Sequence, residues 1–588
     1  MEPTGTGPAE PPAPASRGGA AARLDRLYEF ERAPVTQEKL LGPGYFAGSF
    51  AGEHVAATEF VIGALFVSWG AGLKDIFLGL AIGNLLAVLS WTLVCAPIAV
   101  RTRLTLYWYL RRACGPLFSV VYNVLNAVLF CILAGCMITV SASAIRIPFG
   151  IPSQVQWYPT SPAFVLVVIL VGAVVVTLAI LGFKKLAAFA SVCSPWMLLM
   201  FVAGALAVLP VLGERAGAGP VRSLETFLET AHKTIWTGKT PSGGPRAITF
   251  WQIAAFAWIC NLAMHLGLSD MALFRFARRS WYGLCSAFGM FLGHYLAWIC
   301  AGIMGAGAAL LLKRPLTELD SGAVAFQALG VAGAIAVVIA GWTTSNPTLY
   351  RAGLALQAVT PNWARWKVTL AAGAATTLVA CFPFVFTKLL DFVGLYGLLL
   401  SPAGAIVIAE HWLLPRLGME SFWRERRGIA NNVPALIAWG GGMALALLLW
   451  ATGALHLFFL FIPVFLFTIL SYILLARAAG GGKGKARARP AAPETSLPEG
   501  SASPPAGPPG RDRSAPRRRT GPFTWFLGSL ALLSLLACLV LPLVVFFAPP
   551  EDFGVTFHWF RNWLLFPTLL YFPAATAFAL RKKKEAPK

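Results

Sequence analysis

Long apolar runs alternate with short polar segments along most of the chain. A membrane-spanning helix needs about 20 mostly apolar residues to cross the hydrocarbon layer. Fourteen runs meet this requirement. They lie at about 45–70, 73–100, 117–141, 163–182, 187–213, 248–270, 285–312, 324–350, 368–387, 391–414, 433–455, 456–476, 522–548 and 562–580. The pattern predicts an all-α polytopic membrane protein with about 14 transmembrane helices.

The composition supports this class. Of 588 residues, 57% are hydrophobic and 12% are charged, and the mean hydropathy is +0.69. A soluble domain does not have such a composition. The net charge of +22 comes from short basic runs between apolar segments, which argues against nucleic acid as a partner and agrees with the positive-inside rule. We therefore expect a protein of the cell (inner or plasma) membrane with both termini cytoplasmic.

Composition also divides the chain into five parts. We expect a mostly disordered cytoplasmic tail at 1–43, a twelve-helix core at 44–476 and a basic, Pro/Gly-rich cytoplasmic linker at 477–521. Two additional transmembrane helices follow at 522–580, and a basic cytoplasmic tail follows at 581–588. The ten cysteines form no Cys-x-x-Cys pair, so we expect neither a disulfide framework nor a metal site among them.

The sixth apolar run carries polar residues where a lipid-facing helix would carry Leu or Val. Asn261, His265 and Gly267 lie in its middle, and Trp258 precedes them. Polar groups at membrane depth are costly and normally face a cavity or a partner, and such residues also weaken the helix. We predict that Asn261, His265 and Trp258 bind substrate. The alternative is that these side chains only bond neighbouring helices.

The first run is also polar, with Glu53, His54, Thr58 and Glu59. Two carboxylates and an imidazole at this depth indicate a proton or cation pathway. We expect Glu53 and His54 to be hydrated near the cytoplasmic end, and we assign Glu59 to substrate binding.

The eighth run ends in four consecutive residues with side-chain oxygens, Thr343 to Asn346, followed by Pro347. Sodium and other hard cations bind hydroxyl and carbonyl oxygens. The alternative is that the hydroxyls bond the carbonyl one turn back. In the tenth run we expect Glu410 to be an interfacial charge close to Arg416.

Four segments together resemble the nucleobase:cation symporter-1 family, which comprises cytosine, purine, allantoin and hydantoin permeases. They are GLKDIFLGLAIGNLL with IAVRTRLTLYWYLRRACG, DMALFRFAR, GWTTSNPTLYRAGLAL and SPAGAIVIAEHW. The resemblance covers roughly 40–475 and implies a LeuT-type core, in which two five-helix repeats of inverted topology place broken first and sixth helices together. It further implies a sodium site at Gly341, Thr343, Thr344 and Ser345. The third run, FCILAGCMITV, lacks the Gly-Trp pair that stacks on the substrate ring in many members.

These features predict a secondary active transporter that imports a small polar solute, a nucleobase or related heterocycle, with sodium or protons by alternating access. Two alternatives stay open: a transporter-like sensor that binds solute without moving it, and a LeuT-fold transporter for amino acids or amines. The sequence contains no Walker, His-Glu-x-x-His or Gly-x-Ser-x-Gly motif, so we expect neither ATP-driven transport nor an enzyme. We expect no cofactor beyond the coupling ion, and no partner beyond solute and lipid.

Overall fold

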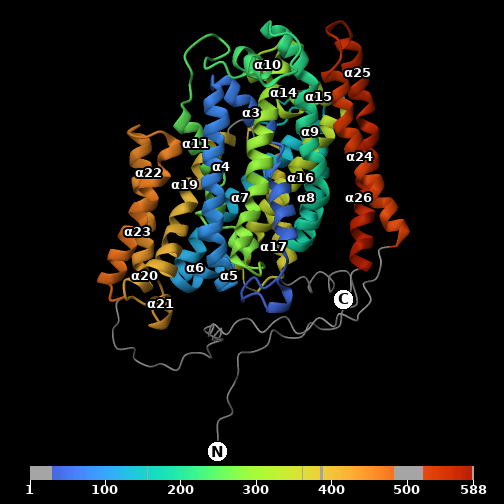
Figure 1. Cartoon of the computed structure of the whole chain (residues 1–588). Coiled ribbons are helices and arrows are strands. Elements are labelled where there is room, and N and C mark those ends of the chain that lie inside the picture. The colour runs from blue at the N-terminus through green and yellow to red at the C-terminus, as the bar shows by residue number, and fades with distance from the viewer. Residues whose placement is uncertain (1–28, 155, 361, 385–388, 482–520, 586–588) are drawn as a thin grey trace, which may run out of the picture.

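The computed structural model describes residues 29–585 apart from 155, 361, 385–388 and 482–520, and these parts form a helical bundle (Figure 1). Within them the β-structure is limited to isolated bridges. The expected disorder of 1–28 and of most of the 477–521 linker concerns residues outside the described parts.

The following helices build the centre of the bundle: α2 (Pro43–His54), α3 (Glu59–Ser68), the Asp75–Thr102 helix that contains α4, α7 (Pro116–Ile145), α8 (Pro162–Ile180), α9 (Phe183–Ala216), α11 (Phe250–Ile259), α12 (Leu262–His265), α13 (Met271–Phe274), the Ser280–Leu312 helix that ends in α14, α15 (Ser321–Leu329), α16 (Val331–Val359), α17 (Arg365–Ala380) and the Phe392–Arg416 helix that begins within α19.

The first membrane helix is broken in its middle. Helix α2 ends at His54, and α3 begins at Glu59 after a bend of 51°. At the end of α2, Val55 leaves helical geometry with ψ at 66°. Because the helix does not continue, backbone carbonyls near the end of α2 lack the N–H donors that a next helical turn would supply. Transporters whose half-helices line a site have the same feature.

The sixth membrane helix is broken twice. A capping box between Thr249 and Gln252 starts α11. The helix is interrupted at Asn261, whose φ of −116° is not helical, and again at Leu268, whose φ of 64° is in the left-handed region. The predicted weakness around Asn261 to Gly267 is confirmed, and the Leu268 conformation is one that non-glycine residues rarely adopt.

Small residues let other helices approach these breaks. A Cβ atom on Gly404 of α19 would lie 1.8 Å from the Leu266 carbonyl oxygen, so the backbone of α19 lies directly against the sixth-helix break. A Cβ on Gly341 of α16 would lie 2.0 Å from Ser141 Oγ on α7. In membranes such close backbone contacts replace the hydrophobic driving force that operates in water.

The expected count of about fourteen spans is too high by the criteria of length and apolar composition. In the described residues ten helices are long and apolar enough to cross a membrane, or eleven when the bent pair α2–α3 is one span. The runs predicted at 248–270 and 368–387 give only short helices, α11 at 10 residues and α17 at 16. The run at 324–350 is divided between α15 and α16. A break shortens α11, whereas α16 is long enough at 29 residues but is not apolar enough to count as a span.

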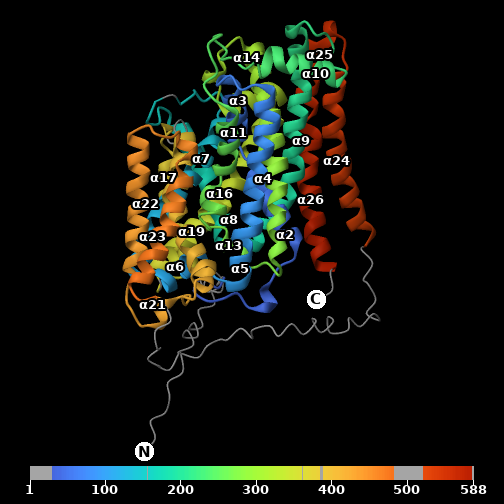
Figure 2. The same ribbon diagram turned by 60° about the vertical axis from the view of Figure 1, so that its left-hand side comes forward.

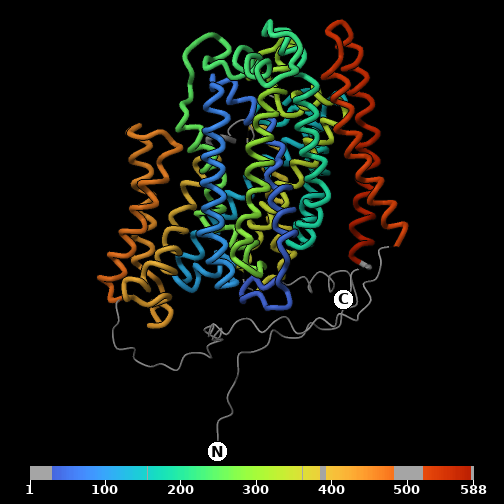
Figure 3. Tube along the Cα trace, in the orientation of Figure 1, coloured from blue at the N-terminus to red at the C-terminus, as the bar shows by residue number. Residues whose placement is uncertain are grey.

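Four further helices lie at opposite edges of the bundle in both ribbon views (Figures 1 and 2). On one edge are α22 (Val433–Ala451) and α23 (Phe461–Ala478). On the other are α24 (Pro522–Phe546) and α26 (Leu565–Glu585), and α26 contacts α9 through Trp196 Nε1 to Thr568 Oγ1 at 3.2 Å. In the tube view the first described residues, in blue, lie at the same end of the bundle as the end of α26 (Figure 3).

Glu410 is not the interfacial charge that the sequence suggested. It is fully buried, and the Tyr472 hydroxyl of α23 donates a 2.7 Å hydrogen bond to its Oε2. The Phe422 backbone N–H donates to Oε1 at 2.5 Å. Glu410 therefore links α23 to the end of the Phe392–Arg416 helix, because a buried carboxylate needs donors from its neighbours.

Candidate functional site

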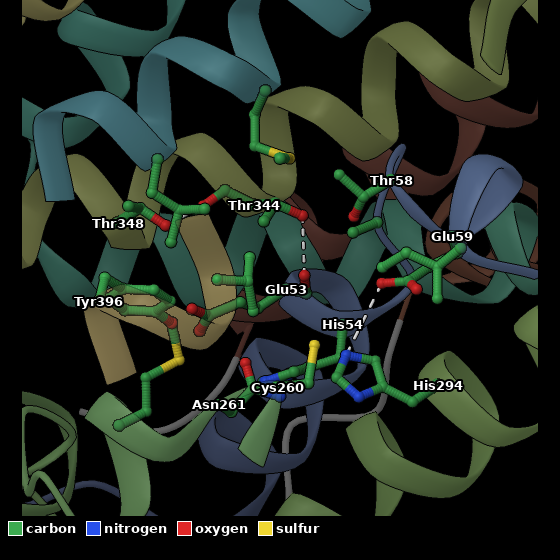
Figure 4. Close-up of a pocket in the computed structure, with 16 residues that line it drawn as sticks. Glu53, His54, Thr58, Glu59, Cys260, Asn261, His294, Thr344, Thr348 and Tyr396 are labelled. Atoms are coloured by element: carbon green, nitrogen blue, oxygen red, sulfur yellow. Dashed lines mark hydrogen bonds and ion pairs between the residues drawn. The ribbon is translucent and has the colours of Figure 1, made fainter. Parts of the chain in front are cut away.

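A cavity of about 50 Å³ lies where the breaks of the first and sixth helices meet (Figure 4). Its walls come from α2, α3, α7, α11–α12, η6 (Phe288–Ala297), α16 and α19. Its polar lining residues are Glu53, His54, Thr58, Glu59, Asn261, His294, Thr344, Thr348 and Tyr396. Three residues of the predicted site, Glu59, Asn261 and Thr344, meet at this cavity.

A buried ion-pair network closes one side of the cavity. Arg351 Nη1 lies 2.6 Å from Glu53 Oε1 and Nη2 lies 3.1 Å from Oε2, and Arg351 Nε lies 2.9 Å from Asp270 Oδ1. Trp91 Nε1 donates to the other Asp270 oxygen at 2.7 Å. All three charged side chains are buried, so each carboxylate has the donors that its burial requires. The network ties α16 to the end of α2 and to the start of α13.

One expectation is corrected by this network. Glu53 and His54 are each only 2% exposed and are not hydrated residues at a membrane surface. Arg351, which lies inside α16, was not among the predicted site residues. The missed signal is helical spacing: Thr344, Thr348 and Arg351 follow at intervals of four and three, so they share one face of α16.

Thr344 joins α16 to the end of α2. Its Oγ1 lies 2.7 Å from the Glu53 carbonyl oxygen and 3.0 Å from the Ala340 carbonyl oxygen. One hydroxyl proton cannot serve both acceptors at once. Three oxygens from two helices therefore converge beside the cavity, next to the broken backbone of the first helix, which is the donor set that suits a hard cation.

The other predicted cation ligands lie elsewhere on α16. Ser345 Oγ donates to the Gly341 carbonyl at 2.5 Å, and Thr343 Oγ1 donates to the Ala340 carbonyl at 3.1 Å. Gly341 packs on α7, as described above, and none of the three lines the cavity. The Ser345 hydroxyl thus matches the alternative expectation, in which a hydroxyl bonds the backbone carbonyl one helical turn earlier.

Glu59 lies in the first turn of α3 and is 2% exposed. Its Oε2 accepts a hydrogen bond from Trp298 Nε1, and its Oε1 lies 3.7 Å from His294 Nε2. The His294 ring stacks on Trp298 with centroids 4.4 Å apart and meets the His54 ring edge-on at 5.2 Å. Figure 4 shows Glu59, His294 and His54 on the same side of the cavity. Sequence reasoning missed His294, because a single histidine in an apolar run carries no pattern.

The sixth-helix residues separate into two groups. Asn261 lines the cavity and is 6% exposed. His265 does not: its Nε2 lies 2.9 Å from the Trp258 carbonyl oxygen, so this nitrogen donates and the ring bridges the break in its own helix. The Trp258 indole donates to Ser90 Oγ at 3.0 Å and packs edge-on against Phe461 of α23. Tyr396 of α19, which the prediction omitted, is the aromatic ring that lines the cavity.

The fold has counterparts among solved structures. The chain resembles Mhp1, a nucleobase-cation-symport-1 family transporter, in a closed conformation with bromovinylhydantoin bound, with a TM-score of 0.58 and 18% identity over 77% of this chain and 96% of that chain. The inward-facing conformation of Mhp1 gives a TM-score of 0.56 at 16% identity over 77% and 94%. A Na⁺-coupled sialic acid symporter in a substrate-bound outward-open state gives 0.55 at 15% identity over 79% and 96%.

Sequence comparisons add no family assignment, since no protein-family model matches and no curated protein matches. At identities below one fifth, likeness to a structure establishes the fold alone. The predicted fold class is confirmed: this is an all-helical integral membrane protein with the LeuT-type fold, and the solved structures that it resembles are transporters.

Proposed function

We propose that this protein is a secondary active transporter that imports a small polar solute together with a cation by alternating access. The observation that carries the proposal is the convergence of the Glu53 and Ala340 carbonyls on the Thr344 hydroxyl, beside a polar cavity at two broken helices. Backbone freed at such breaks, together with hydroxyls, is how half-helix transporters hold ions and solutes.

Sodium is the coupling ion that this oxygen set suits best. A cation between the end of α2 and α16 would hold the broken first helix against the helix that carries Thr344. Ion binding would thereby favour one arrangement of these two helices, which is the differential affinity that coupling requires. Coupling to protons is the second candidate, and it draws on Glu59.

For the solute we propose a nucleobase or related heterocycle. Asn261 offers an amide that both donates and accepts, and Tyr396 offers an aromatic ring at the same cavity. The cavity of about 50 Å³ has room for a few water molecules, whereas drug-sized ligands occupy about 300–1,000 Å³. Solute binding therefore needs the helices to move apart. A LeuT-fold transporter of amino acids or amines is the alternative, favoured by the carboxylate of Glu59.

The test begins with the purified full chain. Thermal shift with nucleobases, hydantoins and amino acids, with and without sodium, identifies the solute class. Uptake of the hit into proteoliposomes under an imposed sodium or proton gradient then measures transport. We expect stabilisation that depends on both solute and cation, followed by accumulation against a gradient. Specific binding without accumulation would overturn the transporter and support a sensor.

A further inference from the structure

The carboxylates around the cavity outnumber the basic groups that balance them. Glu53, Glu59 and Asp270 are all buried. Within the described residues, Glu53 and Asp270 share one guanidinium, that of Arg351, and Glu59 does not contact it. With neutral imidazoles and ionised carboxylates, this region carries two excess negative charges. Buried charge without compensation is strongly unfavourable, so the protein needs cations here.

The two excess charges lie at different places. One belongs to the Arg351 network, whose Glu53 carbonyl also faces Thr344. A cation bound there would compensate it. The other is on Glu59, across the cavity. In the described part of the chain, His294 is the basic side chain within 4 Å of Glu59. A compensating cation for Glu59 must therefore bind at Glu59 or at His294.

The donors around Glu59 select a proton over a metal ion. An indole N–H and an imidazole nitrogen face its two oxygens. The remaining titratable groups beside it are the His54 imidazole, the Cys260 thiol and the paired carboxylate of Glu53, whereas a hard cation needs several oxygen ligands. The titratable and charged groups that face this position are His54, Glu53, Cys260 and His294.

The two histidines are also incompletely bonded. His54 Nδ1 lies 2.9 Å from the Phe50 carbonyl, so it carries the proton of the neutral ring. His54 Nε2 and His294 Nδ1 are buried and have no hydrogen-bond partner among the described residues. Unsatisfied buried ring nitrogens at a cavity are costly in a purely structural role. They are accounted for when water enters the cavity and delivers protons.

We propose that Glu59 and His294 form a proton-binding site that is separate from the cation site at Thr344 and that makes transport dependent on pH. The proton-binding site itself does not depend on the proposed function, and only its effect on transport rests on that function. In this step a hydronium ion that enters the cavity from solution transfers a proton to a Glu59 oxygen or to His294 Nε2. One O–H bond of the hydronium breaks, one O–H or N–H bond forms at the site, water is left, and the charge of the site rises by one. Because Glu59 begins α3 and His294 lies on η6, the proton alters the attraction between these two elements.

The direct test is infrared difference spectroscopy of the full chain in lipid nanodiscs, without solute and at fixed sodium. The pH is stepped from about 5 to about 9, the range in which perturbed carboxyl and imidazole groups exchange protons. We expect a carboxylic-acid C=O band that is lost as the pH rises. Glu59→Gln should abolish this band, and His294→Gln should move its midpoint by about one pH unit, a tenfold change in proton affinity. The control that should leave the titration unchanged is Glu318→Gln, at an exposed carboxylate. Glu410→Gln is measured as well, to assign the contribution of a second buried carboxyl that lies away from the cavity.

A titrating spectrum that is the same in Glu59→Gln and in the wild type, with no band that depends on Glu59, would overturn the proposal. If Glu59→Gln does not fold, His294→Gln decides. An unchanged midpoint of the carboxylic-acid band in that variant would overturn the proposed Glu59–His294 pair. The outcomes are distinct from those for the proposed function. Sodium-dependent stabilisation with no Glu59 titration rejects only the proton site. A Glu59 titration in a protein that accumulates no solute rejects only the transporter.

Discussion

The guanidinium of Arg351 and the carboxylate of Glu53 form a two-point ion pair in the interior of a membrane bundle, with N–O distances of 2.6 and 3.1 Å. The partners come from α16 and from the last turn of α2. The same guanidinium also bonds Asp270 beside the sixth-helix break. One side chain thus holds both broken helices to α16, so any movement of the half-helices must act on this contact.

Removing this guanidinium should strongly destabilise the protein. Arg351→Met leaves two buried carboxylates without their cation, and breaking a buried pair in this way costs about 3–5 kcal/mol. Thermal unfolding of the purified protein measures the loss. The control is Arg314→Met, which removes an exposed pair with Glu318 whose side chains are 57% and 53% exposed, where about 0–1 kcal/mol is expected. Equal losses in the two variants would contradict a structural role for the network.

Thr344→Ala should weaken the response to sodium. The change removes one of the three converging oxygens, so the sodium concentration for half-maximal thermal stabilisation should rise about tenfold, equivalent to about 1.4 kcal/mol. Thr344→Ser keeps the oxygen and should stay close to wild type. Thr177→Ala is the matched control, since Thr177 is exposed and also bonds a carbonyl one turn back. An identical sodium response in the Thr344 and Thr177 alanine variants would remove Thr344 from the cation site.

Asn261→Ala and His265→Ala should change different properties, solute affinity in the first variant and stability in the second. Asn261 lines the cavity, so its loss should weaken solute binding while the melting temperature of the empty protein changes little. His265 bonds the Trp258 carbonyl across the break. Its loss should lower stability by about 0.5–1.5 kcal/mol and leave the affinity of the folded protein unchanged. Binding titration and thermal unfolding of both variants check this, and a loss of affinity confined to His265→Ala would reverse the assignment.

Gly404→Ala should disturb the packing of α19 on the sixth-helix break. The new methyl group would lie 1.8 Å from the Leu266 carbonyl oxygen, and this backbone atom cannot rotate away. Overpacking of this kind costs about 1–3 kcal/mol. Gly440→Ala in α22 is the control, because a Cβ there has nothing within 4 Å and alanine is the better helix former by about 0.5–1 kcal/mol. The melting temperature should fall in the first variant and hold or rise in the second.

The buried carboxyl of Glu31 should make the stability of the protein depend on pH. Glu31 lies at the end of the bundle where the chain enters α2. Burial raises the pKa of the Glu31 carboxyl above its ordinary 4.5, and this effect outweighs the nearby Arg275 and Arg365. The folded state therefore holds the Glu31 proton more tightly than the unfolded state does. This contribution to stability is present at pH values below 4.5 and is lost as the pH rises through the raised pKa.

In Glu31→Gln that loss should disappear. Melting temperatures measured from about pH 4 to about pH 7, where carboxyls of raised pKa titrate, should fall less with rising pH than in the wild type. Glu318→Gln, at an exposed carboxylate, should keep the wild-type slope. A Glu31→Gln slope that matches the wild type would show that Glu31 does not contribute to the pH dependence.

The sequence by itself determined the membrane class and indicated that the first and sixth helices are interrupted. Bilayer thickness imposes long apolar runs, and polar residues such as Asn261 interrupt them wherever backbone must be freed. Glu59 and Thr344 were found because such groups are rare at membrane depth. The resemblance of four segments to a transporter family predicted the LeuT-type fold, and the solved structures confirm it.

Tertiary structure decided which polar residues meet. Arg351 lies 298 positions from Glu53 and 81 from Asp270 along the chain, and local spacing says nothing about such pairs. The direction of Trp258 and the role of His265 depend on how the sixth helix is rotated and where it breaks, which neighbours such as Gly404 set through backbone contact. Breaks shorten some helices, such as α11, and polar residues lower the apolar content of others, such as α16, so counting apolar runs overestimated the spans. Burial of a charge is a property of the packed bundle, because only the surrounding helices exclude water from it.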